Sequence, residues 1–525
     1  MNLRNRIILL SIFVCFWMTT PGMAQISLPD VIGSGMVLQQ KQPVPVWGKA
    51  IPGQEVTVKF AGQVKKTKTG VNGHWKVKLD PMKASSTPRT MTITGSNIVK
   101  LDSVLVGEVW FCSGQSNMQL VLWSSNKSIR TTKGDSVIAS AHYPMLKLFN
   151  VSRAVGFGHK KGKLGTWQAC TPQSVKDFSA AAYYFGHRLQ EKLGVPVGII
   201  NDSYGGSQAE AWTPQQYLSK YNELKPTIER TKKWRKERPE VRKKYHKQLR
   251  EWHKKAEKAK KEGKSFHGAP HPPAALRDYR IAGSIYWHMV RPIVPYAIKG
   301  AFWYQGESNA GRAWQYGLLL PTMIHAWRDR WGEGKFPMGI VQLPNFRNQK
   351  KQPQDAAWSH LRDAQRVTAD TVANTGLIVT IDIGKAHNIH PPDKLDVGKR
   401  MRRWALSDVY GYKMTGTGPM YKRYKVEGSK VMVWFSSVGK GLKSKDGEPL
   451  HTFAIAGKNK KWHWAKAKIV GKNKVKVWSD AVPHPVAVRY AFNNNPKDPN
   501  LTNNTGLPAA PFRTDHWRGP TYRKE

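Results

Sequence analysis

The sequence predicts an α/β protein with a mostly parallel central sheet, preceded and followed by β-rich regions. Between residues 103 and 415, short apolar runs alternate with helix-like segments, an order typical of parallel strands joined by crossover helices. Outside this part, apolar residues recur at every second position between glycine-containing turns, as in antiparallel strands with one buried face. A strongly basic segment at 220–264 interrupts the α/β part and is predicted to be a helical insertion.

In chain order, residues 1–24 are predicted to be a signal peptide. Basic residues precede an apolar run at 7–18 that is too short to span a membrane, and small residues ending at Ala24 form a suitable cleavage site. A buried N-terminal helix or a membrane anchor is the alternative. We expect export to the periplasm or the extracellular space, with a mature chain that begins at Gln25 and has no membrane partner.

The mature chain is predicted to contain three regions. Residues 25–102 form an N-terminal β-domain, residues 103–415 the α/β domain and residues 416–525 a C-terminal β-region, with β-sandwich-like modules on both flanks. In the α/β domain, residues 178–193 place apolar side chains on one helical face and end at Gly194, a typical helix stop. The predicted strands of this domain are 104–112, 197–201, 301–304, 338–343 and 377–383.

The protein is strongly basic, with 84 Lys or Arg against 35 Asp or Glu and a formal net charge of +49. The insertion at 220–264 carries only +12 of this charge, so the remaining +37 is spread over the rest of the chain. Such a charge raises the question of whether the protein binds a nucleic acid, but export argues against genomic DNA as its partner. We therefore expect no nucleic-acid partner and favour adaptation to an anionic or saline setting, with binding to acidic polysaccharides. The insertion itself is expected to be a solvated surface element.

The sequence lacks the motifs of several common enzyme classes. It has no Walker A loop, no GxGxxG turn after a strand, no HExxH and no paired CxxC. His387 and His390 could form a metal pair, but no third ligand clusters near them. We therefore expect neither a metal nor another cofactor. Of the cysteines beyond the signal peptide, Cys112 and Cys170 could form one disulfide or be two buried thiols.

A serine follows the first predicted strand of the α/β domain. Residues 107–118 read GEVWFCSGQSNM, an apolar strand that runs directly into a small polar turn containing Ser116. Open α/β sheets bind their ligands at the carboxyl ends of the strands. Met118 stands where a nucleophile elbow would need its second glycine, so this is not the α/β-hydrolase motif. Ser116 is therefore either a nucleophile or the cap of the next helix.

Three later strand ends favour the catalytic interpretation. They carry a glycine pair, which lets backbone N–H groups approach a ligand closely, then an amide with a carboxylate, and finally an imidazole. A nucleophile, oxyanion donors and a base at successive strand ends are what acyl transfer requires. These residues are, in chain order, Gly205 and Gly206, Gln305 and Glu307, and His390.

The sequence resembles the SGNH hydrolases, and more closely their sialate O-acetylesterase branch, in four ordered blocks. The blocks read GQSNM, SYGGSQAEAWTP, WYQGESN and IDIG…NIHPPDK. The resemblance extends over nearly the whole mature chain, from residues 36–48 to residues 511–515. It implies a flavodoxin-like catalytic domain. It is less specific for substrate, since the related acetylxylan esterases share the GQS and QGE blocks.

The resemblance implies roles for the residues at the strand ends. Ser116 would be the nucleophile and His390 its general base. The backbone N–H of Ser116 and of Gly205 or Gly206, with the side chain of Gln305, would form the oxyanion hole.

The acid that orients the histidine has two candidates. SGNH enzymes usually carry an aspartate three residues before the histidine, but His387 occupies that position here. Glu307 and Asp382 remain. In related esterases with a QGE block the glutamate is the third member of the triad, so the resemblance favours Glu307.

We therefore expect an exported serine esterase that removes O-acetyl groups from carbohydrate through an acetyl-serine intermediate. Its substrate-binding residues are predicted to be Trp212, Trp303 and Asn309, although the two rings could instead pack beneath the site. An acetylxylan or other polysaccharide acetylesterase is the first alternative. A non-catalytic glycan-binding protein that keeps the fold is the second, and a nucleic-acid binder, supported by charge alone, is the third.

Overall fold

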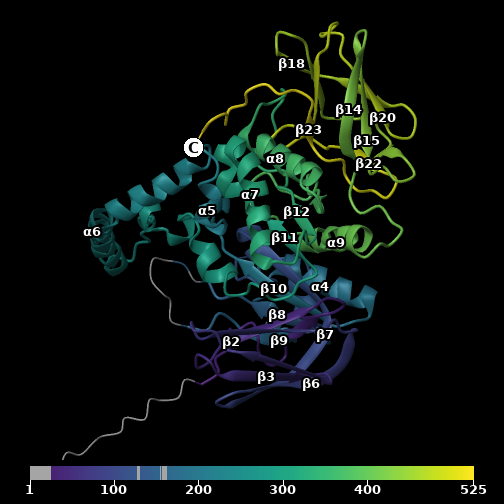
Figure 1. Ribbon diagram of the computed structural model, residues 1–525. Helices are drawn as coiled ribbons and strands as arrows, with labels where there is room; N and C mark the ends of the chain where they lie inside the picture. Colours follow the sequence, from purple (N-terminus) through teal and green to yellow (C-terminus); the bar gives the residue numbers. More distant parts are fainter. Residues whose placement is uncertain (1–24, 127–129, 154, 156–161, 525) are drawn as a thin grey trace, which may run out of the picture.

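The computed structural model describes residues 25–126, 130–153, 155 and 162–524 (Figure 1). The predicted signal peptide lies outside the described residues. Within the described ranges, no helix combines the length and the apolar composition needed to cross a membrane.

A mostly parallel sheet forms the centre of the protein and confirms the predicted α/β class. Its strands lie in the spatial order β13 (Thr375–Ile378), β12 (Met338–Val341), β11 (Gly300–Tyr304), β7 (Ile98–Gly114), β10 (Val197–Ser203), β8 (Tyr143–Asn150) and β9 (Trp167–Cys170). All neighbours are parallel except β8 and β9. The chain builds one side of β7 first and then the other, so the order reverses at β7, where such sheets bind ligands.

Helices cover both faces of this sheet because successive side chains of a strand point to opposite faces. Trp110 of β7 packs against α4 (Ala180–Leu193) and α9 (Lys394–Trp404) through Phe185 and Trp404. The next residue, Phe111, packs on the other face against Trp327 and Trp331 of α7 (Ala313–Trp331), which lies beside α8 (Ala357–Thr371). The central sheet is therefore buried on both faces.

The strand β7 also joins the N-terminal β-region to the central sheet. Its first half pairs with β6 (Ser85–Thr94), and its last residues pair with β10 and β11. The expected boundary between residues 102 and 103 therefore falls inside one continuous strand. The other strands of this region are β1 (Val37–Gln39), β2 (Val44–Lys49), β3 (Glu55–Phe60), β4 (Gln63–Lys68) and β5 (His74–Leu79).

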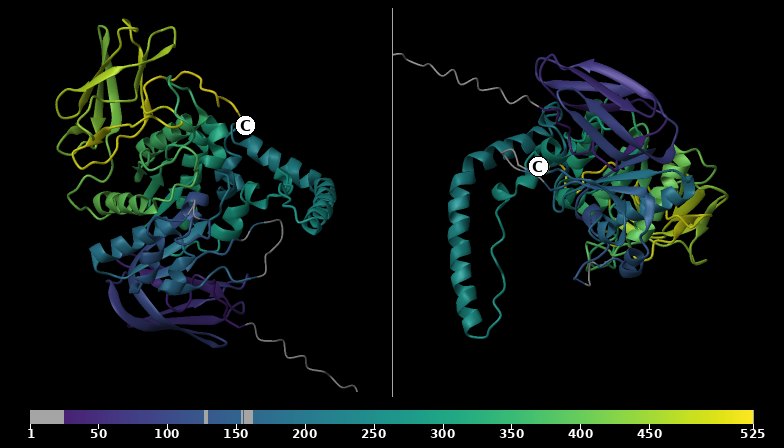
Figure 2. Two further views of the ribbon diagram at one scale, coloured as in Figure 1. Left: turned by 180° about the vertical axis from the view of Figure 1, so that it is seen from behind. Right: turned by 90° about the horizontal axis from the view of Figure 1, so that it is seen from below.

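The basic segment forms a helix that projects from the body of the protein, with the returning chain alongside it (Figure 2). This is α6 (Lys225–Lys261), which confirms the predicted helical insertion. Most of its side chains are exposed, but Thr227 and Thr231 in its first turns are buried. The inner end of the helix is therefore part of the core, whereas the outer end is solvated.

The C-terminal region contains two four-stranded antiparallel sheets (Figure 1). The first consists of β14 (Met420–Glu427), β15 (Lys430–Ser436), β20 (Lys474–Trp478) and β19 (Lys466–Ile469). The second consists of β18 (Trp462–Trp464), β17 (Phe453–Ala456), β21 (Ala487–Tyr490) and β23 (Phe512–Arg513). A short pair, β16 (Leu442–Ser444) and β22 (Leu501–Asn503), completes the region.

One predicted strand is shorter than expected. The segment predicted at 377–383 leaves the sheet after Ile378, the last residue of β13. Beyond this point side-chain contacts hold the chain: the Thr380 hydroxyl donates to the Gln342 carbonyl at 2.5 Å, and the Asp382 carboxylate binds Arg400. A long loop, and not a strand end, therefore carries the chain to α9.

Candidate active site

Ser116 and His390 meet at the carboxyl edge of the central sheet. Ser116 is the first residue of the short helix α1 (Ser116–Gln119), directly after β7, and His390 lies in the loop between β13 and α9. Nε2 of His390 is 2.9 Å from Oγ of Ser116. This is the distance at which an imidazole can take the proton of a serine hydroxyl. The structure thus brings the predicted nucleophile and the predicted base into contact.

The second candidate acid, Asp382, is engaged elsewhere. Its two carboxylate oxygens accept hydrogen bonds of 2.7 and 2.8 Å from the guanidinium of Arg400. Asp382 makes no contact with His390, whose Nδ1 has no hydrogen-bond partner among the residues that the structure describes. Asp382 was a candidate because it was predicted to lie in a strand, but β13 ends at Ile378, four residues before Asp382. The structure therefore does not support Asp382 as the acid that orients His390.

Glu307 lies closer to the nucleophile but also does not touch His390. Its Oε1 accepts a hydrogen bond of 2.5 Å from Nδ2 of Asn117, the residue after Ser116. Its Oε2 is buried without a hydrogen-bond partner within the described part of the chain. Burial raises the pKa of Glu307, and the Asn117 hydrogen bond and the charge of Lys394 only partly offset this.

Asn117 connects the three segments that build the site. Besides Glu307, its Nδ2 contacts the backbone carbonyl of Ile389 at 3.0 Å, and its Oδ1 accepts a hydrogen bond of 2.6 Å from Nζ of Lys394. The helix of the nucleophile, the QGE loop and the loop of His390 are thereby joined by one side chain. Sequence reasoning missed both Asn117 and Lys394, although each stands in a block that it had singled out.

Lys394 places a buried, titratable amine beneath the site. The side chain is completely buried, and desolvation lowers its pKa to about 7, against the opposing influence of Glu307 and Asp393. Burial and then the charge of Lys394 lower the pKa of His390 below its ordinary value of 6.5. The imidazole is therefore neutral at pH 7, the form that accepts a proton.

The glycine turn after β10 lies against the nucleophile. A Cβ atom on Gly205 would be 3.5 Å from Cβ of Ser116. The N–H of Gly205, however, donates to Oε1 of Gln119 at 2.5 Å. The N–H groups of Ser116 and Gly206 have no such partner among the described residues. Of the predicted backbone oxyanion donors, these two are the available ones.

Gln305 is not directed toward Ser116, contrary to the expectation for the oxyanion hole. Its side chain is completely buried, and its amide donates to the Ser207 carbonyl at 3.2 Å and to Oδ1 of Asn309 at 2.8 Å. Asn309 in turn donates to Glu210 at 2.9 Å and is itself buried. The predicted substrate contact of Asn309 is therefore not supported, and both amides belong to a network beneath the site.

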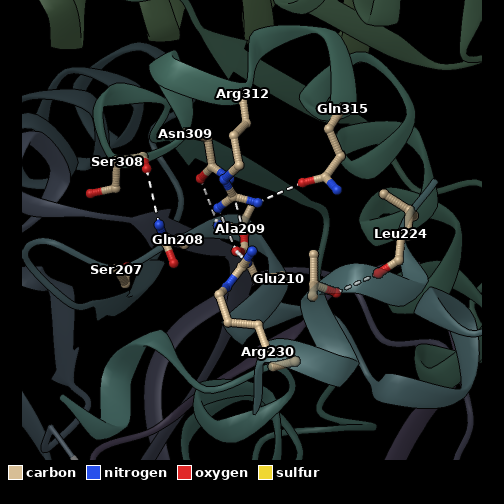
Figure 3. A network of polar contacts seen from close by, with 12 residues as sticks. Ser207, Gln208, Ala209, Glu210, Leu224, Arg230, Ser308, Asn309, Arg312 and Gln315 are labelled. Atoms are coloured by element: carbon tan, nitrogen blue, oxygen red, sulfur yellow. Dashed lines mark hydrogen bonds and ion pairs between the residues drawn. The ribbon is translucent and has the colours of Figure 1, made fainter. Parts of the chain in front are cut away.

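This network centres on the buried carboxylate of Glu210 (Figure 3). Its Oε1 forms ion pairs with Arg230 of α6 at 2.8 Å and with Arg312 at 2.6 Å. Although burial raises the pKa of Glu210, the two arginines outweigh it, and the pKa is lowered. The inner end of α6 is thus tied to the residues that support the QGE loop, which a purely solvated insertion would not be.

The two tryptophans beside the blocks are packing residues. Trp212 and Trp303 are both fully buried and pack edge to face, with ring centroids 5.5 Å apart. Neither ring offers a face to a sugar, so the predicted stacking is not supported and the packing alternative is. Cys112 and Cys170 are two free, buried thiols, which answers the question that their positions in the sequence left open.

Comparisons with known proteins agree with this architecture. Residues 274–406 match the family model described as carbohydrate esterase, sialic acid-specific acetylesterase. The chain is 32% identical to a carbohydrate acetylesterase from Xanthomonas citri of known crystal structure, which aligns with a TM-score of 0.77 over 94% of this chain and 100% of that one. Sialate O-acetylesterase from Homo sapiens is 27% identical over 92% of this chain and 91% of its own length. Sialate O-acetylesterase from Mus musculus is 28% identical over 75% of this chain and 76% of its own length.

These similarities cover nearly the whole chain and place it among the carbohydrate esterases with an SGNH-type fold, which are carboxylic ester hydrolases. The chain belongs to the sialate O-acetylesterase family of that superfamily. The family resemblance seen in the four sequence blocks is confirmed.

Replacing Lys394 by Met tests the buried charge. Because the pKa of Lys394 falls from 10.5 to about 7 on burial, the unfolded chain binds more protons than the folded chain between these pH values. Lys394 should therefore contribute a rise with pH to the free energy of unfolding over this range. Lys394→Met should lack that rise in urea denaturation at several pH values. Lys399→Met, on the exposed side of the same helix, should follow the wild-type curve, and a Lys394→Met curve parallel to it would contradict the assignment.

Replacing Glu307 by Gln distinguishes a direct from an indirect acid. A carboxylate that directly holds the histidine is worth about 10⁴ in kcat. Because Glu307 reaches the site only through Asn117, Glu307→Gln should lower kcat on an acetyl ester by about tenfold, the effect of one modest contact. Asp382→Asn should leave kcat nearly unchanged. A loss of several thousandfold in Glu307→Gln would mean that the carboxylate contacts Nδ1 during the reaction.

Proposed function

We propose that this protein removes O-acetyl groups from carbohydrate, in the manner of a sialate O-acetylesterase, with Ser116 as nucleophile and His390 as general base. The observation that carries the proposal is the 2.9 Å contact between Oγ of Ser116 and Nε2 of His390 at the switch point of the sheet. The family to which the chain belongs supplies the substrate class. The names of its relatives, which include both a carbohydrate acetylesterase and sialate O-acetylesterases, support an acetylated sugar as the substrate.

In this proposal the reaction has two halves. Oγ of Ser116 attacks the acetyl carbonyl carbon while its proton moves to Nε2 of His390, and the N–H groups of Ser116 and Gly206 stabilise the oxyanion that develops. The bond to the sugar oxygen then breaks, and His390 returns the proton to that oxygen. Water, deprotonated by the same imidazole, attacks the acetyl-serine and releases acetate with a free Ser116.

Among the residues that the structure describes, no carboxylate contacts His390 directly. Its backbone N–H donates to Oδ1 of Asn388 at 2.9 Å, and the preceding carbonyl, that of Ile389, contacts Asn117. The proposed roles of Asn117 and Lys394 are therefore to position the histidine loop. Glu307 is bonded to Asn117 as well, and its carboxylate attracts the buried Lys394 amine electrostatically.

The N-terminal 24 residues support a further proposal, that the enzyme is exported. Their basic start, short apolar run and small-residue cleavage site follow in the order of a signal peptide. An exported enzyme would meet acetylated glycans outside the cytoplasm. Sequencing of the N-terminus of the mature protein, expected to begin at Gln25, tests this.

Ser116→Ala and His390→Ala test the catalytic pair. Each variant should release acetate from an O-acetylated sugar at least about a thousandfold more slowly than the wild type, because nucleophile and base act as one unit. Unfolding curves should match the wild type, since neither side chain is part of the core. Residual activity of either variant above about one per cent would contradict the assignment.

The basic surface supports binding to acidic polysaccharide. The outer end of α6 can be removed without disturbing Arg230, because Tyr245 donates to the carbonyl of Pro270 at 3.2 Å and the two chain segments lie together there. Replacing residues 246–269 by a four-residue linker removes a net charge of only +5. Binding to polygalacturonate should weaken partly and fall with salt, and turnover of 4-nitrophenyl acetate should stay the same.

A matched variant tests whether polygalacturonate binding depends on the total positive charge of the protein and not on the charges of α6 in particular. Five exposed lysines of the C-terminal region are changed to glutamine, which removes the same charge: Lys422, Lys430, Lys440, Lys458 and Lys461. This variant should weaken polygalacturonate binding about as much as the truncation does. Loss of all binding in the truncated protein alone would instead locate the site on α6, and loss of turnover would show that the outer helix belongs to the active site.

A further inference from the structure

A pocket of about 390 Å³ lies beside the glycine turn of the active site. One wall contains Tyr204, the residue before Gly205. The lining also contains Tyr279 and Arg277, which belong to the segment that returns from α6 to the central sheet. Neither the residues of this segment nor Tyr204 has a part in the proposed chemistry.

The two tyrosines form an aromatic platform. Their rings are stacked, with centroids 5.1 Å apart and an interplanar angle of 23°. Both side chains line the pocket and both are partly exposed. Partly exposed aromatic side chains that line a pocket are suited to contact the apolar face of a sugar ring.

Only the glycine pair separates this platform from the nucleophile. Gly206 has a φ of +73°, and a Cβ atom there would come within 3.4 Å of the ring of Tyr279. On the other side, a Cβ atom on Gly205 would lie 3.5 Å from Cβ of Ser116. The glycine turn therefore packs against the Ser116 side chain on one side and against the ring of Tyr279 on the other.

The pocket also offers a positive charge. Nε of Arg277 donates to the carbonyl of Pro272 at 2.7 Å, which holds the side chain in place, while its terminal nitrogens have no partner among the described residues. The neighbouring acid, Asp278, is already paired with Arg238 of α6. The charge left for a ligand is thus that of a guanidinium, which pairs well with carboxylates.

We propose that this pocket is the sugar-binding subsite of the enzyme, in which the acetylated sugar contacts the stacked rings of Tyr279 and Tyr204 and an acidic group of the same sugar pairs with Arg277. The subsite rests on the proposed esterase function and names the groups of this chain that would bind the sugar and select an acidic one. It also gives the inner part of α6 a role. Arg238 holds the wall that carries Tyr279 through its bonds to Asp278 and to the carbonyl of Ala275 at 3.3 Å.

The test measures KM and kcat on three substrates, an O-acetylated sialic acid, an O-acetylated neutral methyl glycoside and 4-nitrophenyl acetate. Tyr279→Ala should raise KM for both sugars by about five- to tenfold, the usual cost of losing a binding tyrosine. Tyr279→Phe should keep the wild-type KM, because the ring remains. Arg277→Gln should raise KM for the acidic sugar alone. The exposed positions Tyr424→Ala and Arg89→Gln serve as matched controls.

In all these variants, kcat/KM for 4-nitrophenyl acetate should equal that of the wild type, which shows that the catalytic pair is intact. Unchanged sugar KM values in Tyr279→Ala would overturn the subsite while leaving the esterase function standing. Equal effects of Arg277→Gln on both sugars would overturn the preference for acidic sugars. If the wild type released no acetate from any substrate, the esterase function would fail, and calorimetric binding of sialic acid, weaker in Tyr279→Ala than in wild type, would still support the subsite. Equal binding would overturn it.

Discussion

The close approach of β7 to its two neighbours is the constraint on which the site depends. The N–H of Tyr204 donates to the Gly114 carbonyl, and the N–H of Gln115 donates to the Tyr304 carbonyl, each at 3.0 Å. A Cβ atom on Gly114 would lie 2.2 Å from the Tyr304 carbonyl oxygen, a distance that no side chain tolerates. Because three strands must end at the same level, the turns that follow them are held within reach of one another.

Much of this arrangement could be predicted from the sequence, because parallel strands end at one edge and polar residues after an apolar run mark that edge. Ser116, Gly206 and His390 were found in this way. The same reasoning failed for Gln305, because a position after a strand does not reveal the direction of the side chain. It failed for Asp382 because β13 is four residues long, and the side chain lies in a loop bound to Arg400.

Asn117 and Lys394 could not be found by pattern at all. An asparagine that bridges a carboxylate and an amine has no characteristic spacing, since its partners are 190 and 277 residues away in sequence. A lysine in a polar block reads as a surface residue, and only the packing around Lys394 shows that it is buried. An unshared buried charge is costly, so the hydrogen bond to Asn117 and the electrostatic attraction of Glu307 and Asp393 help to account for how the amine is tolerated.

The insertion between the second and third blocks has a consequence for the diversity of such enzymes. One continuous stretch of chain, from Arg230 to Tyr279, braces the support network at one end and forms the wall of the aromatic pocket at the other. The proposed catalytic pair, Ser116 and His390, comes from other segments. Exchange of the part of this stretch that follows Arg230 would alter the proposed sugar pocket while leaving the Glu210 network and the Ser116–His390 pair in place, so that selectivity and catalysis could diverge as separate modules.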